Sequence, residues 1–400
     1  MQSPLSLRLS NVNDHFPTIW SNLVLEKRIN RAVCMQLVND SVCSQESSKF
    51  WRPYFSYPLQ FFLFLWCFLV RVVELTKEEN LLLHFNWDSD PPERNPFLNH
   101  LIATVNNSLP FNKYAYLTTH NSFAIDGEPS HTGVPRVTVT NQEDSVTQQL
   151  NNGVRALMLD TYDFDGDVWL CHSFDGKCLD ITAFEPAIDT LKEIEVFLSA
   201  NPSEIVTIIL EDYVHAPNGL TKVFTEAGLM KYMFPLANMP RNGGDWPLVT
   251  DMVAKNHRLL VFTSIKSKEE SEGIAYQWNF MVENQYGDGG RREGSCPNRA
   301  ESAPLNDTSK SLVLVNYFRT VPIKEITCQD NSGGLINMLH TCYGASGNRW
   351  ANFVAVDYYE RSEGGGSFQA VDTLNGKLLC GCDDVHACEP GSTSHACTSP

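Results

Sequence analysis

One short stretch of this chain decides its fold: Thr118-Thr119-His120-Asn121-Ser122-Phe123. It follows an apolar run and precedes a loop that contains Gly127. A histidine followed by an asparagine at the end of a strand places an imidazole that titrates near neutral pH beside a neutral oxygen ligand. The stretch therefore predicts a polar site at the end of a strand spanning 114–119.

Three further predicted strands are each followed directly by an acidic residue. They span 154–159, 205–210 and 353–356, and the residues after them are Asp160, Glu211 and Asp357. A second histidine, His172, follows in the run Leu-Cys-His-Ser. Buried carboxylates are costly unless they are paired or bind a cation, so acids at strand ends predict a functional site.

Strands and helices alternate from residue 109 onward. Helical periodicity predicts helices at 184–198, 220–227, 248–255 and 336–342, with further strands at 259–263, 274–282 and 311–316. Such alternation predicts a parallel sheet, and seven or eight strands in roughly 260 residues favour a closed (β/α)8 barrel. An open doubly wound sheet is the alternative, but no Gly-x-Gly-x-x-Gly follows the first strand. In such barrels the active site lies where the strands end.

The chain divides into three predicted regions. Residues 1–108 show no sustained period and are expected to form a poorly ordered extension, 109–376 form the barrel, and 377–400 form a cysteine-rich tail. An apolar run at 61–70 is too short for a membrane-spanning helix, which needs about 20 apolar residues. Its length suits the core of a signal peptide, although its position does not. A signal anchor, a cleaved signal behind an unusual leader and a misassembled N-terminus all stay open, and entry to the secretory pathway is favoured.

The net charge and the cysteine content limit the binding partners and the cellular compartment that can be expected for this protein. The formal net charge of −17 argues against nucleic-acid binding and works against docking on anionic lipid, while leaving membrane contact open. The chain has 12 cysteines without clean zinc spacing, so most are predicted to form disulfides in an oxidising compartment. Free buried thiols are the alternative. We expect a secreted or membrane-anchored monomer.

The motifs around His120, Asp160, His172 and Glu211 resemble the X-domain of phosphatidylinositol-specific phospholipase C, and more closely the secreted, single-domain PLC-like phosphodiesterases of plants. The resemblance covers about 109–359. It implies a distorted TIM barrel of the PLC-like phosphodiesterase type, a hydrolase of lipid metabolism that cleaves a phosphodiester through attack by a neighbouring hydroxyl. The first hundred residues do not fit this pattern.

The resemblance also implies three catalytic roles. His120 matches the histidine that takes the proton from the attacking hydroxyl, and His172 matches the one that protonates the departing alkoxide. Asp357 looks like the carboxylate that orients the first histidine. Structural roles are the alternative for each of them, including a partnership of Asp357 with Arg349 or Arg361.

A calcium site is the third implication of the resemblance. Asn121, Asp160 and Glu211 match three calcium ligands, whereas Met158 stands where a fourth, acidic ligand is expected. A thioether is a poor ligand for a hard cation, so a weak site, a site completed by Asp163 or water, and no metal at all stay open. Bacterial members place an arginine at the position of Asp160, so the sequence favours a divalent metal as the positive partner of the phosphate.

The predicted function is therefore that of a phosphoric diester hydrolase or lyase acting on a phosphoinositide or a glycosylated relative. Two alternatives remain. Glycerophosphodiester hydrolysis on the same barrel usually needs Arg-Gly after the first histidine, where this chain has Asn121 and Ser122. A catalytically weak, secreted headgroup-binding module is the other alternative, and Met158 motivates it.

Overall fold

The computed structural model describes residues 108–173, 176–363, 365–389 and 397. The predictions for the N-terminal extension and for its apolar run at 61–70 lie outside these residues. Within the described ranges, none of the helices combines the length and the apolar character that crossing a membrane requires.

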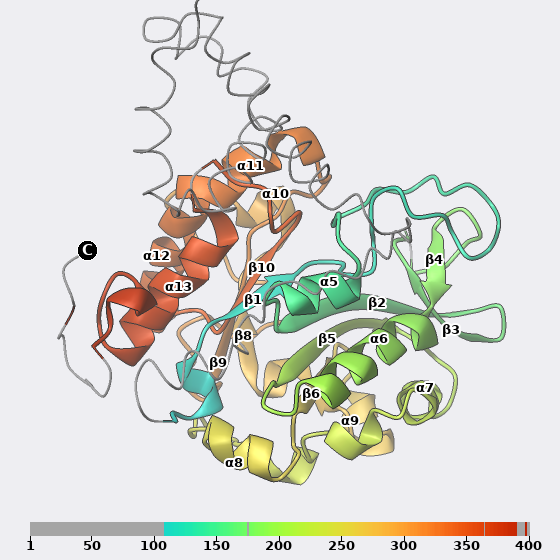
Figure 1. The fold of residues 1–400 in the computed structure, drawn as a ribbon, viewed down its shortest axis with the longest axis horizontal. Coiled ribbons are helices and arrows are strands. Elements are labelled where there is room, and N and C mark those ends of the chain that lie inside the picture. Colours follow the sequence, from blue (N-terminus) through green and yellow to red (C-terminus); the bar gives the residue numbers. More distant parts are fainter. Residues whose placement is uncertain (1–107, 174–175, 364, 390–396, 398–400) are drawn as a thin grey trace, which may run out of the picture. The chain divides into compact units, whose positions relative to one another are not determined.

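Parallel strands form the centre of the described domain (Figure 1). The hydrogen-bonded order is β7-β6-β5-β2-β1-β10-β9-β8, so the last strand, β10, closes against the first, β1. In the described part of the chain no ladder joins β7 to β8, so the ring is interrupted there. The predicted distorted (β/α)8 barrel is confirmed. Its strands are β1 (Tyr116–Thr119), β2 (Ala156–Phe164), β5 (Val206–Tyr213), β6 (Leu259–Thr263), β7 (Ala275–Tyr276), β8 (Met281–Glu283), β9 (Leu312–Asn316) and β10 (Phe353–Val356).

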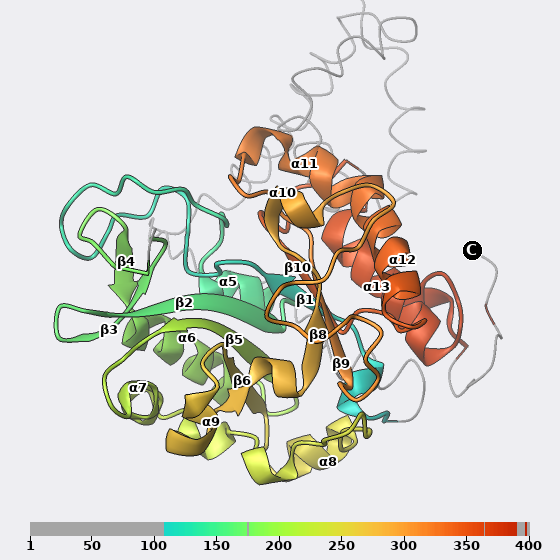
Figure 2. The ribbon, with the colours of Figure 1, turned by 180° about the vertical axis from the view of Figure 1, so that it is seen from behind.

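Helices cover the outside of the strands (Figures 1 and 2). The first, α5, begins at a capping box in which Ser145 and Gln148 bond each other's backbone. The last, α13, begins after Gly365, whose φ of 83° a side chain would strain. The helices are α5 (Val146–Asn151), α6 (Ala187–Ala200), α7 (Gly219–Glu226), α8 (Val249–Ala254), α9 (Ser267–Ser271), α10 (Gly287–Gly290), α11 (Thr327–Gln329), α12 (Leu335–Ala345) and α13 (Gly366–Leu379).

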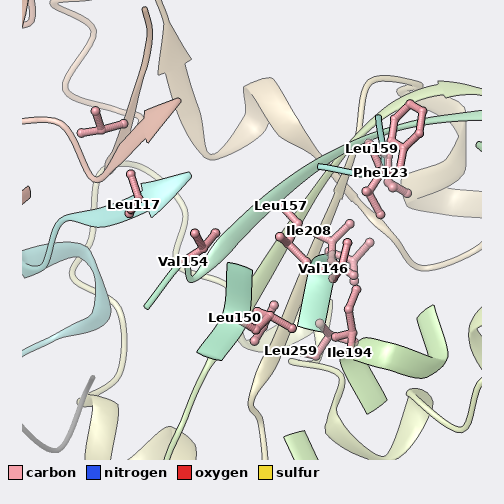
Figure 3. Close-up of a cluster of buried hydrophobic side chains, with 14 of the residues drawn as sticks. Leu117, Phe123, Val146, Leu150, Val154, Leu157, Leu159, Ile194, Ile208 and Leu259 are labelled. Carbon is pink, nitrogen blue, oxygen red and sulfur yellow. The ribbon is translucent and has the colours of Figure 1, made fainter. Parts of the chain in front are cut away.

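Alternation along the strands divides the apolar side chains into two cores. Leu157 of β2 and Ile208 of β5 face outward and pack with Val146 of α5 and Ile194 of α6 (Figure 3). Inside the barrel lies a second cluster, which includes Tyr116, Ala156, Ile209, Phe262, Leu314 and Ala355. Because every second side chain of a strand points to the same face, Asp160 of β2 and Glu211 of β5 point inward like Ala156 and Ile209.

Four predicted elements are wrong in their limits. Strands β2 and β5 do not stop before Asp160 and Glu211 but run through them to Phe164 and Tyr213, because β2 continues into an antiparallel hairpin with β3 (Asp167–Cys171). The segment 274–282 is two strands separated by a 3-10 turn. Phe184, assigned to a helix, lies in β4 (Ala183–Pro186).

Four disulfides confirm the prediction for most of the described cysteines. They join Cys171 to Cys178, Cys296 to Cys342, Cys380 to Cys388 and Cys382 to Cys397. Cys328 is a buried free thiol. The bridges close short loops except for Cys296–Cys342, which links positions 46 residues apart.

Candidate functional site

His120 follows β1 directly and its imidazole is held on several sides. Nδ1 lies 2.8 Å from Oδ1 of Asp357, the residue after β10. Because β1 and β10 pair in parallel, with Thr119 opposite Val356, the two side chains leave neighbouring strand ends. The ring stacks on Phe318, with centroids 3.6 Å apart and planes 5° apart. With Nδ1 bonded to a carboxylate, Nε2 is the nitrogen left to accept a proton.

One segment of the loop between β1 and α5, residues 138–142, contacts both candidate histidines, and we call it the strap. The side-chain amide of Gln142 donates to the carbonyl of His120 at 2.8 Å. Asn141 Nδ2 donates to Asp357 Oδ1 at 2.9 Å and lies 3.2 Å from the imidazole Nδ1. At its other end Thr138 donates to the carbonyl of His172 at 2.8 Å. The strap thereby ties the two histidines to one piece of backbone.

His172 follows β3 within the loop that the Cys171–Cys178 disulfide closes. Its main-chain nitrogen donates to the carbonyl of Thr182, and its ring Nδ1 lies 3.3 Å from the carbonyl of Val139. Burial lowers the pKa of His172, and the nearby charge of His120 lowers it further. The two imidazoles therefore lie within electrostatic range of each other.

Asp160 and Glu211 stand opposite each other on adjacent parallel strands. Burial raises the pKa of Asp160 well above its usual value, and repulsion from Glu211 adds to the increase. Glu211 is solvent-exposed, and its Oε1 accepts a 2.5 Å hydrogen bond from the Tyr213 hydroxyl. The structure thus brings this pair of predicted acids together at one side of the barrel mouth.

The remaining predicted residues have other partners. The buried amide nitrogen of Asn121 donates weakly to Asn141 Oδ1, at 3.4 Å. Asp163, considered as a further metal ligand, accepts the backbone N–H groups of His215 and Ala216. Met158 packs against the inner core. The alternative partners of Asp357 bond elsewhere: Arg349 donates to main-chain oxygens and Arg361 pairs with Glu143.

Sequence reasoning missed Glu283 and Arg299. Glu283, at the end of β8, is fully buried and accepts hydrogen bonds from Gln277, Trp278 and Asn316. Arg299 Nη1 donates to Glu283 Oε1 at 3.0 Å. The signal was present in the sequence, because Glu283 directly follows the predicted strand 274–282, as the other acids directly follow theirs. Nothing in the sequence links Arg299 to it, since the guanidinium comes from a loop 16 positions further on.

The predicted calcium site has few suitable donors. Calcium takes six to eight oxygen ligands, and the matched positions offer two carboxylates, one amide and the thioether of Met158. Among the described residues no third acidic, histidine or cysteine group joins Asp160 and Glu211 within metal-binding distance. The charge of Arg299 already opposes the rise in the pKa of Asp160. The residues present fit a calcium ion poorly, and calcium stays a prediction of the resemblance.

The chain is similar in sequence to several known proteins. The PI-PLC X family model matches residues 111–375. A PI-PLC X domain-containing protein of Arabidopsis thaliana is 57% identical over 295 residues, covering 74% of this chain and 69% of that protein. An uncharacterized secreted protein of Arthroderma benhamiae is 25% identical over 291 residues, covering 67% and 64%.

Among solved structures, the phosphatidylinositol-specific phospholipase C of Listeria monocytogenes aligns with a TM-score of 0.44 at 13% identity, covering 69% of this chain and 96% of the bacterial one. The family match over residues 111–375 spans both histidines, the acidic pair and Asp357. This chain belongs to the PI-PLC X domain family.

Proposed function

We propose that this protein is a phosphodiesterase that cleaves a phosphoinositide or a related phosphodiester by acid–base catalysis between two histidines. The observation that carries the proposal is the pairing of His120 with Asp357, beside a second histidine held by the same strap. Imidazoles suit both halves of such a reaction because they titrate near neutral pH.

The reaction proceeds in one displacement at phosphorus. Nε2 of His120 takes the proton from the hydroxyl next to the phosphate, and that oxygen attacks phosphorus. The bond from phosphorus to the leaving oxygen breaks, and protonated His172 gives its proton to that oxygen. The product is a cyclic phosphate plus an alcohol. Asp357 keeps a proton on Nδ1 and stabilises the imidazolium that forms on His120.

Secretion is part of the proposal. Four disulfides are present in the described chain, and oxidised cysteine pairs persist in secreted proteins. The Arthroderma relative, named a secreted protein, supports the same compartment. Expression of the full chain in plant cells, with assay of the medium and the membrane fraction, tests this expectation.

Product analysis tests the proposed reaction. Purified protein is incubated with phosphatidylinositol, a glycosylated phosphatidylinositol and glycerophosphodiesters, and the phosphate products are resolved by phosphorus NMR. A cyclic inositol phosphate supports the proposal, whereas glycerol phosphate supports the glycerophosphodiesterase alternative. His120→Ala and His172→Ala should each abolish turnover. His340→Ala, at an exposed position of α12, is the control and should not change turnover.

A headgroup-binding module is the second candidate, because Met158 removes an acidic ligand from the predicted cation site. Calorimetric titration with myo-inositol 1-phosphate separates the candidates. Binding without turnover of any tested diester favours the module, and turnover that depends on His120 excludes it.

A further inference from the structure

The positive charge at the barrel mouth comes from a loop that the sequence did not connect with the site. Arg299 follows β8 by a long loop, and its side chain is only 13% exposed. Nη1 donates to Glu283 at 3.0 Å and Nε donates to Glu301 at 3.1 Å. Among the described residues Nη2 has no hydrogen-bond partner, so one edge of the guanidinium can still donate.

Glu283 makes the position of this guanidinium rigid. The carboxylate is fully buried and accepts from three neutral side-chain donors at 2.7 to 2.9 Å. Two aromatic rings hold the guanidinium as well: its Cζ lies 5.3 Å from the centroid of Trp278 and 4.8 Å from that of Tyr286. A guanidinium fixed in this way loses little side-chain entropy when it binds an anion.

Arg299 also acts on the acidic pair across the barrel. Its charge lowers the pKa of Asp160, against burial and Glu211, which raise it. Burial lowers the pKa of Arg299 itself, but Glu283, Glu211 and Glu301 together raise it above the usual value, so it stays charged. A divalent cation placed beside Asp160 and Glu211 would be repelled by this guanidinium, strongly so where water is scarce.

We propose that Arg299 is the fixed cation of this site and binds the phosphate group of the substrate, so that the reaction needs no divalent metal. This inference rests on the proposed function. The free Nη2 can donate a charge-assisted hydrogen bond to a phosphate oxygen, and the fixed positive charge stabilises the negative charge that develops on the phosphate. Arg299 thus supplies the positive charge that the resemblance assigns to calcium. It does so beside Glu283 at the end of β8, whereas the predicted calcium ligands Asp160 and Glu211 lie on β2 and β5.

Two measurements in EDTA test the inference. Calorimetry measures binding of myo-inositol 1-phosphate, and the product assay measures turnover. Wild-type protein should bind myo-inositol 1-phosphate and cleave the diester without metal. Added Ca²⁺ should change neither the affinity nor the rate. Arg299→Gln should weaken binding on the order of 10- to 100-fold and lower kcat by about 10²- to 10³-fold. Arg299→Lys keeps the charge but loses the planar guanidinium that Glu283 and Glu301 hold in place, so its affinity and kcat should lie between those of the wild type and of Arg299→Gln.

Arg299→Gln leaves Glu283 buried without its partner and can unfold the protein. Arg299→Gln with Glu283→Gln removes both charges and keeps the neutral donors satisfied, and it should show the same losses in a folded protein, judged by circular dichroism. Arg241→Gln is the matched control, since this arginine also pairs with a glutamate and lies over a ring, Phe280.

Wild-type binding that requires Ca²⁺, no binding in EDTA, or wild-type affinity in the folded double variant would each overturn the inference. The proposed function fails separately, if wild-type protein binds the inositol phosphate but cleaves no diester. In that case the loss of binding in Arg299→Gln still supports Arg299 as the anion-binding group.

Discussion

His120 and Asp357 are 237 positions apart in the sequence, yet His120 Nδ1 and Asp357 Oδ1 lie 2.8 Å apart. The contact exists because the first and last strands of the barrel are neighbours, so the residue after each strand emerges at the same edge. The Asp357 side chain is only 4% exposed, and the His120 side chain is 18% exposed. A largely buried carboxylate that backs a reachable imidazole is the arrangement expected of a general base.

Replacing the carboxylate should reduce catalysis more than stability. Asp357→Asn keeps the shape of the side chain but cannot hold the proton on Nδ1 or stabilise the imidazolium. We expect kcat to fall by about 10³- to 10⁴-fold. Steady-state kinetics with the cleaved diester measure the loss, and Asp307→Asn, in a surface loop, is the control. A fall of less than tenfold in a folded variant would contradict the assigned role.

Asn141 is predicted to be a positioning residue. Its amide donates to the same carboxylate oxygen that faces His120. In Asn141→Ala the Asp357 carboxylate loses this donor, so the carboxylate and the imidazole bonded to it are held less firmly in place. We expect kcat to fall by roughly tenfold through loss of alignment. Asn201→Ala, at the end of α6, is the control, and an unchanged kcat in a folded Asn141→Ala would sink the prediction.

The pH optimum of the proposed reaction should lie below neutral pH. Burial and the charge of His120 hold the pKa of His172 below its ordinary value of about 6.5. A general acid works only in its protonated form, so kcat should decline as the pH rises through that lowered pKa. NMR titration of the His172 ring gives the value directly, and kcat of the wild-type protein should decline over the same pH range. An alkaline limb centred above the ordinary value would show that another group is the acid.

Glu185 should make stability depend on pH. Burial raises its pKa to about 7, although Thr190 donates to it. The folded state therefore holds its proton more tightly than the unfolded state, so this group costs up to about 3 kcal/mol of unfolding free energy as the pH rises from 4.5 to 7. Glu185→Gln should unfold at a higher temperature than wild type at pH 8 and at nearly the same temperature at pH 4. Exposed Glu226→Gln should match wild type at both.

Local periodicity carried much of the fold prediction. Apolar runs such as 205–210 and 259–263 correspond to barrel strands because a buried parallel strand must be apolar on both faces. The rule that active sites of such barrels lie where the strands end placed Asp160 and Glu211 at the barrel mouth. It could not show that β2 continues beyond Asp160, since that extension depends on pairing with β3.

The sequence by itself determined the barrel class, most disulfide-forming cysteines and the set of histidines and acids at strand ends. Only the tertiary structure decided that the strap contacts both histidines and that Arg299 reaches the buried Glu283. The physical reason is that repeating side-chain patterns record which face a strand buries, whereas a loop side chain finds its partner only when the barrel closes and brings distant residues together.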